Sequence, residues 1–218
     1  MSALFAEFGV ANLRPLLEGA VLTLYLVAMS GFFGTIIGLV FGMARVAPFG
    51  PVRWVAAAYV NFIRGQPVLI ILLFLYYAIP LMVPSATFAR GPTAIIGLSV
   101  YAGAYIAEIV RGAIESVPRG QGEAASALGM GYLLRYRYVV LPQAMKVAVP
   151  PSIGFLISLV KASSLVSVIN YVELTKAGAI VSNLNQEPLV TFLVVAALYF
   201  ALSYPIALFG RWYERRLV

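Results

Sequence analysis

The sequence predicts an all-α membrane protein with about five transmembrane helices. Hydrophobic residues make up 62% of the 218 residues and charged residues only 11%, well below the quarter that soluble domains carry. The apolar residues gather in five runs, each near the ~20 residues that a helix needs to cross about 30 Å of hydrocarbon. One soluble core would be too small to bury so much apolar surface, so we expect a single transmembrane domain over residues 1–218.

The five predicted spans are 19–43, 66–84, 92–110, 148–170 and 188–210. The apolar segment 52–63 is too short to cross a bilayer, so we expect a helix that lies at the membrane interface and ends at the break Gly65-Gln66-Pro67. A cleavable signal peptide is not expected, because Glu7, Arg14 and Glu18 interrupt the start of the chain.

The first span carries a small residue at every fourth position, namely Ser30, Gly34, Gly38 and Gly42. This spacing places them on one helix face and lets another helix approach closely. The approaching helix belongs either to the same subunit or to a second subunit, and the sequence leaves both alternatives open.

The basic residues predict the orientation of the chain. One set of loops holds Arg45, Arg53, Arg64, Arg111, Arg119, Arg135, Arg137, Lys146, Arg211, Arg215 and Arg216, whereas the other set holds Arg14, Arg90 and Lys176. Loops rich in Lys and Arg stay in the cytoplasm. We therefore expect the N-terminus outside and the C-terminus inside, with residues 111–148 in the cytoplasm.

The cytoplasmic segment 111–148 carries the most distinctive motif. Glu123-Ala124-Ala125 is followed after three residues by Gly129 and, after nine more, by Val139-Val140-Leu141-Pro142. This pattern resembles the EAA loop of bacterial ABC-importer permeases, in which EAA, three residues, Gly and nine residues lead to Ile-x-Leu-Pro. Val139 in place of Ile is the only departure.

Local chemistry predicts how this segment folds. Ser116-Val117-Pro118 and Gly120-Gln121-Gly122 should break the helix of the third span. A short helix from Glu123 to Leu128 should end at Gly129-Met130-Gly131, and Leu141-Pro142 should begin a new helix, since proline is tolerated in a first turn.

The resemblance extends over residues 58–170. FIRGQP at 62–67, YAGAYIAEIVRGAIESVPRGQ at 101–121, LPQA at 141–144 and ISLVK at 157–161 are similar to permeases of the histidine/glutamine/glutamate/opine-type amino acid importers. Gln66 stands where that family usually has Thr.

The resemblance implies a type I (MetI-like) permease fold, in which two permease subunits share one translocation pathway. It also implies docking of a separate ATPase through Glu123, Ala124, Ala125, Gly129, Leu141 and Pro142. The implied partners are a dimer of ATP-binding cassette subunits, which carries the ATP and Mg, a second permease, a periplasmic or extracellular solute-binding protein and the lipid bilayer. The implied location is the bacterial cytoplasmic (inner) membrane.

The fourth span departs from the family, whose members often read NEFISLLKDTSL there, with polar groups near the substrate. Gly154, Phe155 and Ala162 replace the Asn, Glu and Asp, which predicts that a non-identical second permease supplies these polar groups. Lys161 remains, and a lysine inside a span costs about 2.5 kcal/mol or more unless it faces a cavity or a partner. It either meets a substrate carboxylate or snorkels and pairs structurally. The residues expected along the substrate pathway are Ser158, Lys161, Ser163 and Ser164.

Several functional classes are excluded or disfavoured by composition. The chain has no cysteine, histidine or aspartate, so we expect no metal site and no catalytic residue. It lacks GxxxxGK[ST], so ATP should bind only to the partner. The net charge of +7 suits membrane flanks better than nucleic acid. Glu108 and Arg111 are expected to form a structural pair.

The competing functional class is a self-sufficient small channel or a secondary transporter. A secondary transporter usually shows inverted repeats, and five spans do not divide into two equal halves. The sequence leaves the transported amino acid open, because such importers take their selectivity from the separate binding protein.

Overall fold

The computed structural model describes residues 9–83 and 89–216, and every regular element within these ranges is helical. Glu7 and residue 84, which belong to the predicted start and second span, lie outside them. The elements are α1 (Val10–Arg45), α2 (Gly50–Arg64), α3 (Val68–Leu73), the π-turn η2 (Phe74–Ala78), α4 (Ile79–Met82), α5 (Arg90–Ser116), α6 (Arg119–Ala127), α7 (Tyr132–Arg135), the π-turn η3 (Tyr136–Val140), α8 (Leu141–Ala162), the 3₁₀ segment η4 (Ser163–Ile169), α9 (Leu174–Asn185) and α10 (Pro188–Glu214).

Four helices in the described part of the chain are long and apolar enough to cross a membrane: Ala11–Arg45, Arg90–Ser116, Tyr132–Ile169 and Pro188–Glu214. They confirm four of the five predicted spans, and each helix is longer than its prediction. The added turns at the helix ends carry polar and basic side chains, so the length of an apolar run does not include them.

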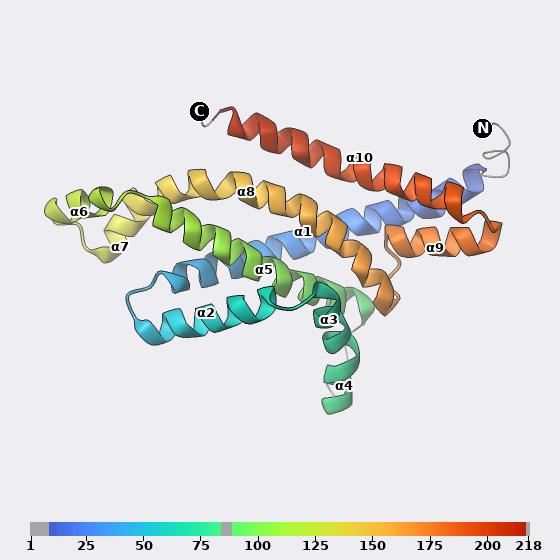
Figure 1. The fold of residues 1–218 in the computed structure, drawn as a ribbon, viewed down its shortest axis with the longest axis horizontal. Coiled ribbons are helices and arrows are strands. Elements are labelled where there is room, and N and C mark those ends of the chain that lie inside the picture. Colours follow the sequence, from blue (N-terminus) through green and yellow to red (C-terminus); the bar gives the residue numbers. More distant parts are fainter. Residues whose placement is uncertain (1–8, 84–88, 217–218) are drawn as a thin grey trace.

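The interface helix was predicted wrongly, and the predicted second span is one limb of a bent pair of helices, which together are long and apolar enough for one span. The segment Val68–Met82 is about 22 Å long at 1.5 Å per residue, too short to cross alone, and it is bent by 101° from α2. Helix α2 lies lengthwise beside α1 and α5, burying Ala56, Val60 and Ile63 (Figure 1), so it does not lie across the end of the bundle. The predicted break at 65–67 is confirmed. A fifth span exists only if Gly50–Met82 counts as one bent span.

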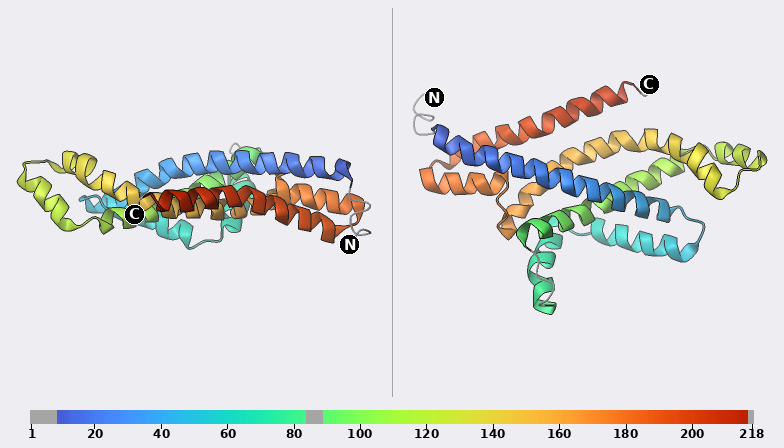
Figure 2. Two further views of the ribbon diagram at one scale, coloured as in Figure 1. Left: turned by 90° about the horizontal axis from the view of Figure 1, so that it is seen from above. Right: turned by 180° about the vertical axis from the view of Figure 1, so that it is seen from behind.

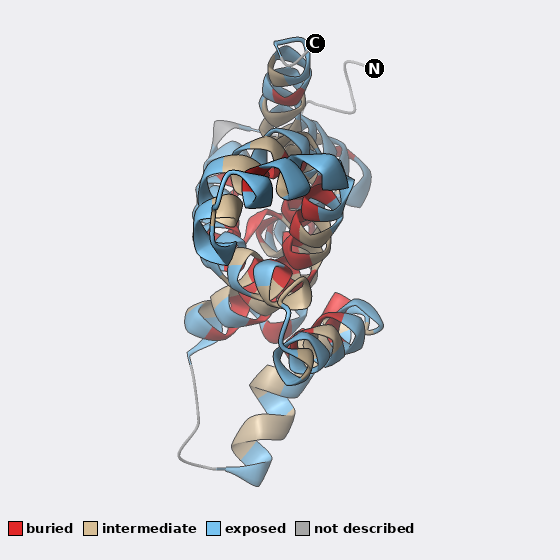
Figure 3. Ribbon diagram, turned by 90° about the vertical axis from the view of Figure 1, so that its left-hand side faces the viewer, coloured by how far each residue is buried: buried red, intermediate tan, exposed pale blue. Residues whose placement is uncertain are grey.

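The segment from Val68 to Met82, here called the arm, projects away from the other helices (Figures 1 and 3). Its first turns bury Val68 and Leu72, whereas Leu81 near its end is 84% exposed. The arm is therefore anchored at one end, at the bend that follows α2.

Helices α1 and α5 pack closely along the small residues of α1. A Cβ atom built on Gly34 would lie 2.5 Å from the Cβ of Ala102, and one on Gly38 would lie 2.5 Å from Cγ2 of Ile106. Carbon atoms in contact normally lie about 3.5–4.0 Å apart, so these glycines allow the approach. The stripe therefore makes a contact within the subunit, which is the first of the two alternatives.

Helix α9 was missed by the sequence prediction. Its buried residues Leu174, Ala177, Gly178, Val181 and Ser182 recur with helical spacing, which is the signal that identifies it. The helix packs on α1 and α10 and lies at the opposite end of the molecule from α6 (Figures 1 and 2). The structure thus has one end built by α6 and α7 and another built by α9 and the start of α1.

Candidate functional site

Helix α6 carries the EAA-like motif at one end of the molecule, beyond the bundle (Figure 1). Helix α5 ends at Ser116, and Val117 and Pro118 take extended backbone before α6 begins at Arg119. The predicted break at 116–118 is therefore confirmed. The predicted break at Gly120-Gln121-Gly122 is wrong, because these residues form the first turns of α6. Glycine lowers helix propensity by about 1 kcal/mol, which the neighbouring residues overcome here.

The exposed surface around the motif combines a charged side chain with apolar ones. Glu123 and Ala124 are exposed, while Ala125 is only 3% exposed. Beyond the helix, Leu128 and Leu133 are 80% and 79% exposed. We call Glu123, Ala124, Leu128, Gly129 and Leu133 the α6 tip surface. An exposed apolar surface with charged residues at its edge is typical of a protein-binding site.

Gly129 ends α6 by a defined capping motif. Its φ is +78°, its N–H donates to the carbonyl of Ser126 at 2.9 Å, and the N–H of Met130 donates to the carbonyl of Ala125 at 3.1 Å. This pair of bonds is the Schellman motif, which requires a left-handed residue and so favours glycine. The prediction that Gly129-Met130-Gly131 ends the helix is confirmed.

Two side-chain contacts tie α6 to the helix that follows. Nη1 of Arg135 donates to Oγ of Ser126 at 2.8 Å, and Nε2 of Gln143 lies 3.5 Å from Oε1 of Gln121. Helix α6, which carries the motif, is thus attached to α7 and to the first turn of α8 by these side-chain contacts.

Helix α8 begins at Leu141 with Pro142 in its first turn, as predicted, but it continues from the preceding turns and is not a separate new helix. The helix starts at Tyr132 and continues through the π-turn η3 into α8. Proline lacks a backbone N–H and so cannot donate a helical hydrogen bond. At Pro142 this missing donor falls where the backbone hydrogen bonding changes from the π to the α pattern. Leu141 is half-buried and Pro142 is exposed.

The predicted pair of Glu108 and Arg111 is confirmed and belongs to a larger group. Nε of Arg111 donates to Oε1 of Glu108 at 3.1 Å. Oε2 of Glu108 accepts from Arg45 and lies 3.3 Å from Nη1 of Arg64, and Arg111 also pairs with Glu115. From the sequence alone these arginines appear only as loop charges, because the packing of α1, α2 and α5 sets their partners.

The four residues predicted along the substrate pathway do not form one cluster. Ser158 and Lys161 are exposed on α8. Ser163 is buried and its hydroxyl donates to the carbonyl of Val160 at 2.7 Å, while the hydroxyl of Ser164 donates to the carbonyl of Lys161 at 2.7 Å. The two latter serines therefore bond to the preceding turn.

Lys161 lies in a mainly apolar groove of about 510 Å³ between α8 and α10, which Tyr199, Ser203 and Tyr204 also line. The hydroxyl of Tyr199 donates to Oε2 of Glu173 at 2.7 Å. Glu173, which was not predicted, is fully buried and accepts hydrogen bonds from the N–H groups of Thr175 and Lys176 at 2.9 and 2.8 Å. An acid directly before an amphipathic segment is the sequence signal of such an N-cap.

Burial raises the pKa of Glu173 above its ordinary value, and the hydrogen bonds from Thr175, Tyr199 and Lys176 oppose this shift only in part. The carboxyl group thus caps α9, but its charged form is destabilised because it is buried away from water.

Phe155 takes part in an aromatic cluster where family members often have glutamate. Its ring stacks on Tyr105 with centroids 5.2 Å apart and lies 6.0 Å from the ring of Tyr101. The guanidinium of Arg64 lies 5.4 Å from the centroid of Tyr105. Aromatic packing thus occupies the place of the acidic group.

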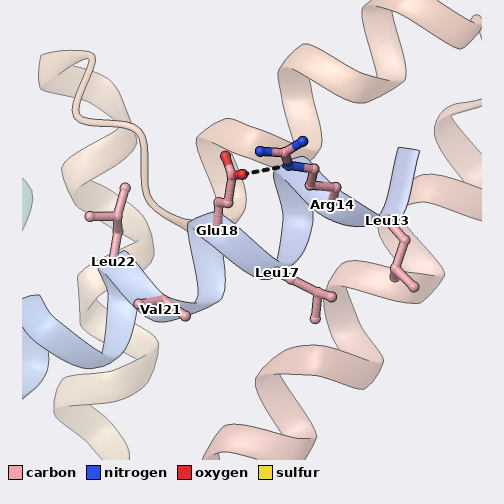
Figure 4. Close-up of a pocket in the computed structure, with 6 residues that line it drawn as sticks. All are labelled: Leu13, Arg14, Leu17, Glu18, Val21 and Leu22. Carbon is pink, nitrogen blue, oxygen red and sulfur yellow. Dashed lines mark hydrogen bonds and ion pairs between the residues drawn. The ribbon is translucent and has the colours of Figure 1, made fainter. Parts of the chain in front are cut away.

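A further apolar groove, of about 540 Å³, lies on the first turns of α1 (Figure 4). Its two charged residues, Arg14 and Glu18, pair with each other at 3.0 Å on the exposed side. Within residues 9–83 and 89–216, no group of three or more acids, histidines or cysteines is placed to hold a metal ion.

Comparison with known proteins gives consistent matches. Residues 34–218 match the family described as binding-protein-dependent transport system inner membrane component. The chain is 37% identical over 210 residues to the probable amino-acid ABC transporter permease protein YckA of Bacillus subtilis, covering 96% of this chain and 92% of that one. It is 34% identical over 202 residues to the glutamine transport system permease protein GlnP of Escherichia coli, covering 93% and 92%.

Two solved structures share the fold. A crystal structure of an amino acid ABC transporter with histidines matches with a TM-score of 0.88 at 31% identity, over 95% of this chain and 96% of that chain. An inward-facing structure of the MetNI methionine ABC transporter matches with a TM-score of 0.80 at 26% identity, over 96% and 99%. The predicted MetI-like fold is confirmed.

Proposed function

The chain belongs to the family of binding-protein-dependent transport system inner membrane components, and from that premise we propose that it forms half of the translocation pathway of an ATP-driven amino acid importer. The relatives named for amino acids support this substrate class. Within the pathway, we propose that Ser158 and Lys161 face the substrate and that Ser163 and Ser164 shape the end of α8.

The observation that carries the proposal is the position of α6. The motif residues lie at one end of the molecule, with Glu123 and Ala124 exposed and a capped turn at Gly129. Residues 111–148 connect this surface to two membrane-crossing helices, α5 and α8. We propose that an ATPase docks on this segment through Glu123, Ala124, Ala125 and Gly129, with Leu141 and Pro142 at its base.

The proposed assembly needs further chains. A dimer of ATP-binding cassette subunits supplies ATP hydrolysis with ATP and Mg, and a solute-binding protein delivers the substrate. A second permease completes the pathway, and the apolar groups at Gly154, Phe155 and Ala162 favour a non-identical homologue that supplies acids. The location is the bacterial inner membrane, with the N-terminus outside and the C-terminus in the cytoplasm, on the basis of the charge bias.

The proposal is tested by reconstitution. The chain is co-purified with its ATPase, second permease and binding protein, which are sought among the products of neighbouring genes, and uptake of labelled amino acids into liposomes is measured with and without ATP. The importer requires ATP and the binding protein for uptake. Downhill flux through the purified chain alone, without ATP, would instead identify the channel alternative.

A further inference from the structure

Three helices meet at the carboxylate of Glu108. Arg45 is the last residue of α1 and Arg64 the last residue of α2, and both pair with Oε2 of Glu108. Arg111, one turn along α5, pairs with Oε1. One oxygen therefore makes the contacts to other helices, and the other oxygen makes the contact within α5.

The group is half-buried within membrane-crossing helices. Glu108 has 24% of its side chain exposed, Arg45 14% and Arg64 38%. Glu108 lies within a candidate span, and Arg45 is the last residue of another. Charged residues inside spans are costly, and they persist where they pair with one another or serve a function. Removing Glu108 would leave three guanidinium groups close together, with only Arg111 still paired, to Glu115, which is more unfavourable than removing one partner of an exposed pair.

The group lies between the base of the arm and the end of α5 that leads into α6. On one side, Arg64 stands directly before the 101° bend that carries the arm, Val68–Met82. On the other side, Arg111 and Glu115 lie in the last turns of α5, which leads through Val117 and Pro118 into α6. Glu108 thus connects the helix that bears the EAA-like motif with the base of the arm.

We propose that Glu108 is a positioning residue that transmits displacement of α6 to the arm, through its contacts with Arg64 and Arg45. When α6 is displaced, the end of α5 tilts, and Oε2 of Glu108 moves relative to the ends of α1 and α2. Arg111 keeps its contacts within α5 during this step, because Glu108, Arg111 and Glu115 lie on the same helix. This inference rests on the proposed function, since it requires an ATPase that acts on α6.

The experiment compares Glu108→Gln with Glu115→Gln in the complete reconstituted complex. Both variants remove one carboxylate from Arg111, but only Glu108 reaches the ends of α1 and α2. The readout is the number of ATP molecules hydrolysed per substrate taken up, which a simple loss of assembled protein does not change. We expect this ratio to rise at least about tenfold in Glu108→Gln and to stay within about twofold in Glu115→Gln.

A second variant keeps the test informative if Glu108→Gln does not assemble. Arg64→Gln removes the ion pair between the end of α2 and Glu108, together with the contact of the guanidinium with Tyr105, and should raise the same ratio. An unchanged ratio in Arg64→Gln would overturn the inference. Because both residues act through one contact, the double variant should be no worse than Glu108→Gln alone. Fully additive effects would overturn the inference.

A distance measurement reports the motion directly. The chain has no cysteine, so spin labels can be placed at Leu81→Cys on the arm and Leu184→Cys on α9, both exposed. The wild-type complex should show a shift of the label distance when a non-hydrolysable ATP analogue binds, and Glu108→Gln should lose it. A normal shift and a normal ratio in Glu108→Gln would overturn the inference. Absence of ATP-dependent uptake in the wild type would instead overturn the proposed function.

Discussion

Replacing Gly129 tests the link between the capped turn and the ATPase. Gly129 has a φ of +78°, and no heavy atom of the described residues lies within 4 Å of a Cβ built there. In Gly129→Ala the cost is therefore backbone strain alone, about 1–2 kcal/mol for a non-glycine residue in left-handed conformation. Reduced freedom of the unfolded chain offsets about 0.4–1 kcal/mol of it, which leaves about 1 kcal/mol against the closed turn.

That magnitude predicts a graded effect on coupling. A loss of about 1 kcal/mol lowers the ratio of closed to open turn roughly fivefold, so substrate-stimulated ATP hydrolysis in liposomes should fall by up to about this factor in Gly129→Ala. Gly129→Trp should abolish the stimulation while membrane insertion stays normal, because it also places a large ring on the α6 tip surface.

Gly131→Ala is the matched control. Gly131 lies two residues away, its φ is −64°, and a Cβ there is equally free of contacts with the residues that the structure describes. We expect near wild-type stimulation. Normal stimulation in Gly129→Trp, or an equal loss in Gly131→Ala, would refute the reasoning.

Three further predictions address orientation, substrate and stability. A reporter fused after Val218 should be active only in the cytoplasm, and its export would contradict the predicted topology. Lys161→Ala should weaken substrate affinity in uptake assays, and wild-type affinity would rule out a role of Lys161 in binding substrate. The chain with only the ATPase and binding protein should not reach full uptake, and full uptake would show that no second, non-identical permease is needed. The raised pKa of Glu173 means that the folded state holds this proton more tightly than the unfolded state. The contribution of Glu173 to stability should therefore be greatest below its ordinary pKa of 4.5, fall as pH rises through the raised pKa and then level off. Glu173→Gln should flatten this dependence in melting curves, and an unchanged slope would assign it to another group.

Much of the fold could be predicted from apolar length and charge. Four spans followed directly from hydropathy, and Gly34 and Gly38 marked the close contact of α1. The path of residues 50–82 could not be predicted, because a short apolar helix fits the interface and the flank of a bundle equally well. Only the packing of Ala56, Val60 and Ile63 against α1 and α5 decides between them.

The candidate site was predicted unevenly. The capped turn at Gly129 followed from glycine chemistry, because only a left-handed residue closes α6 in this way. The pairing of Arg45 and Arg64 with Glu108 joins residues far apart in sequence, so no local pattern reveals it. Helix α9 and its cap Glu173 were not predicted, because this short segment carries polar residues and is not an apolar run, although its helical spacing is present in the sequence.

The most direct measurement of the central claim is site-specific photo-crosslinking in the assembled complex. A photoreactive residue at Glu123, exposed on α6, should form an adduct with the ATPase, whereas the same residue at Leu184, exposed on α9 at the other end, should not. An ATPase adduct from position 184 and none from position 123 would contradict the account.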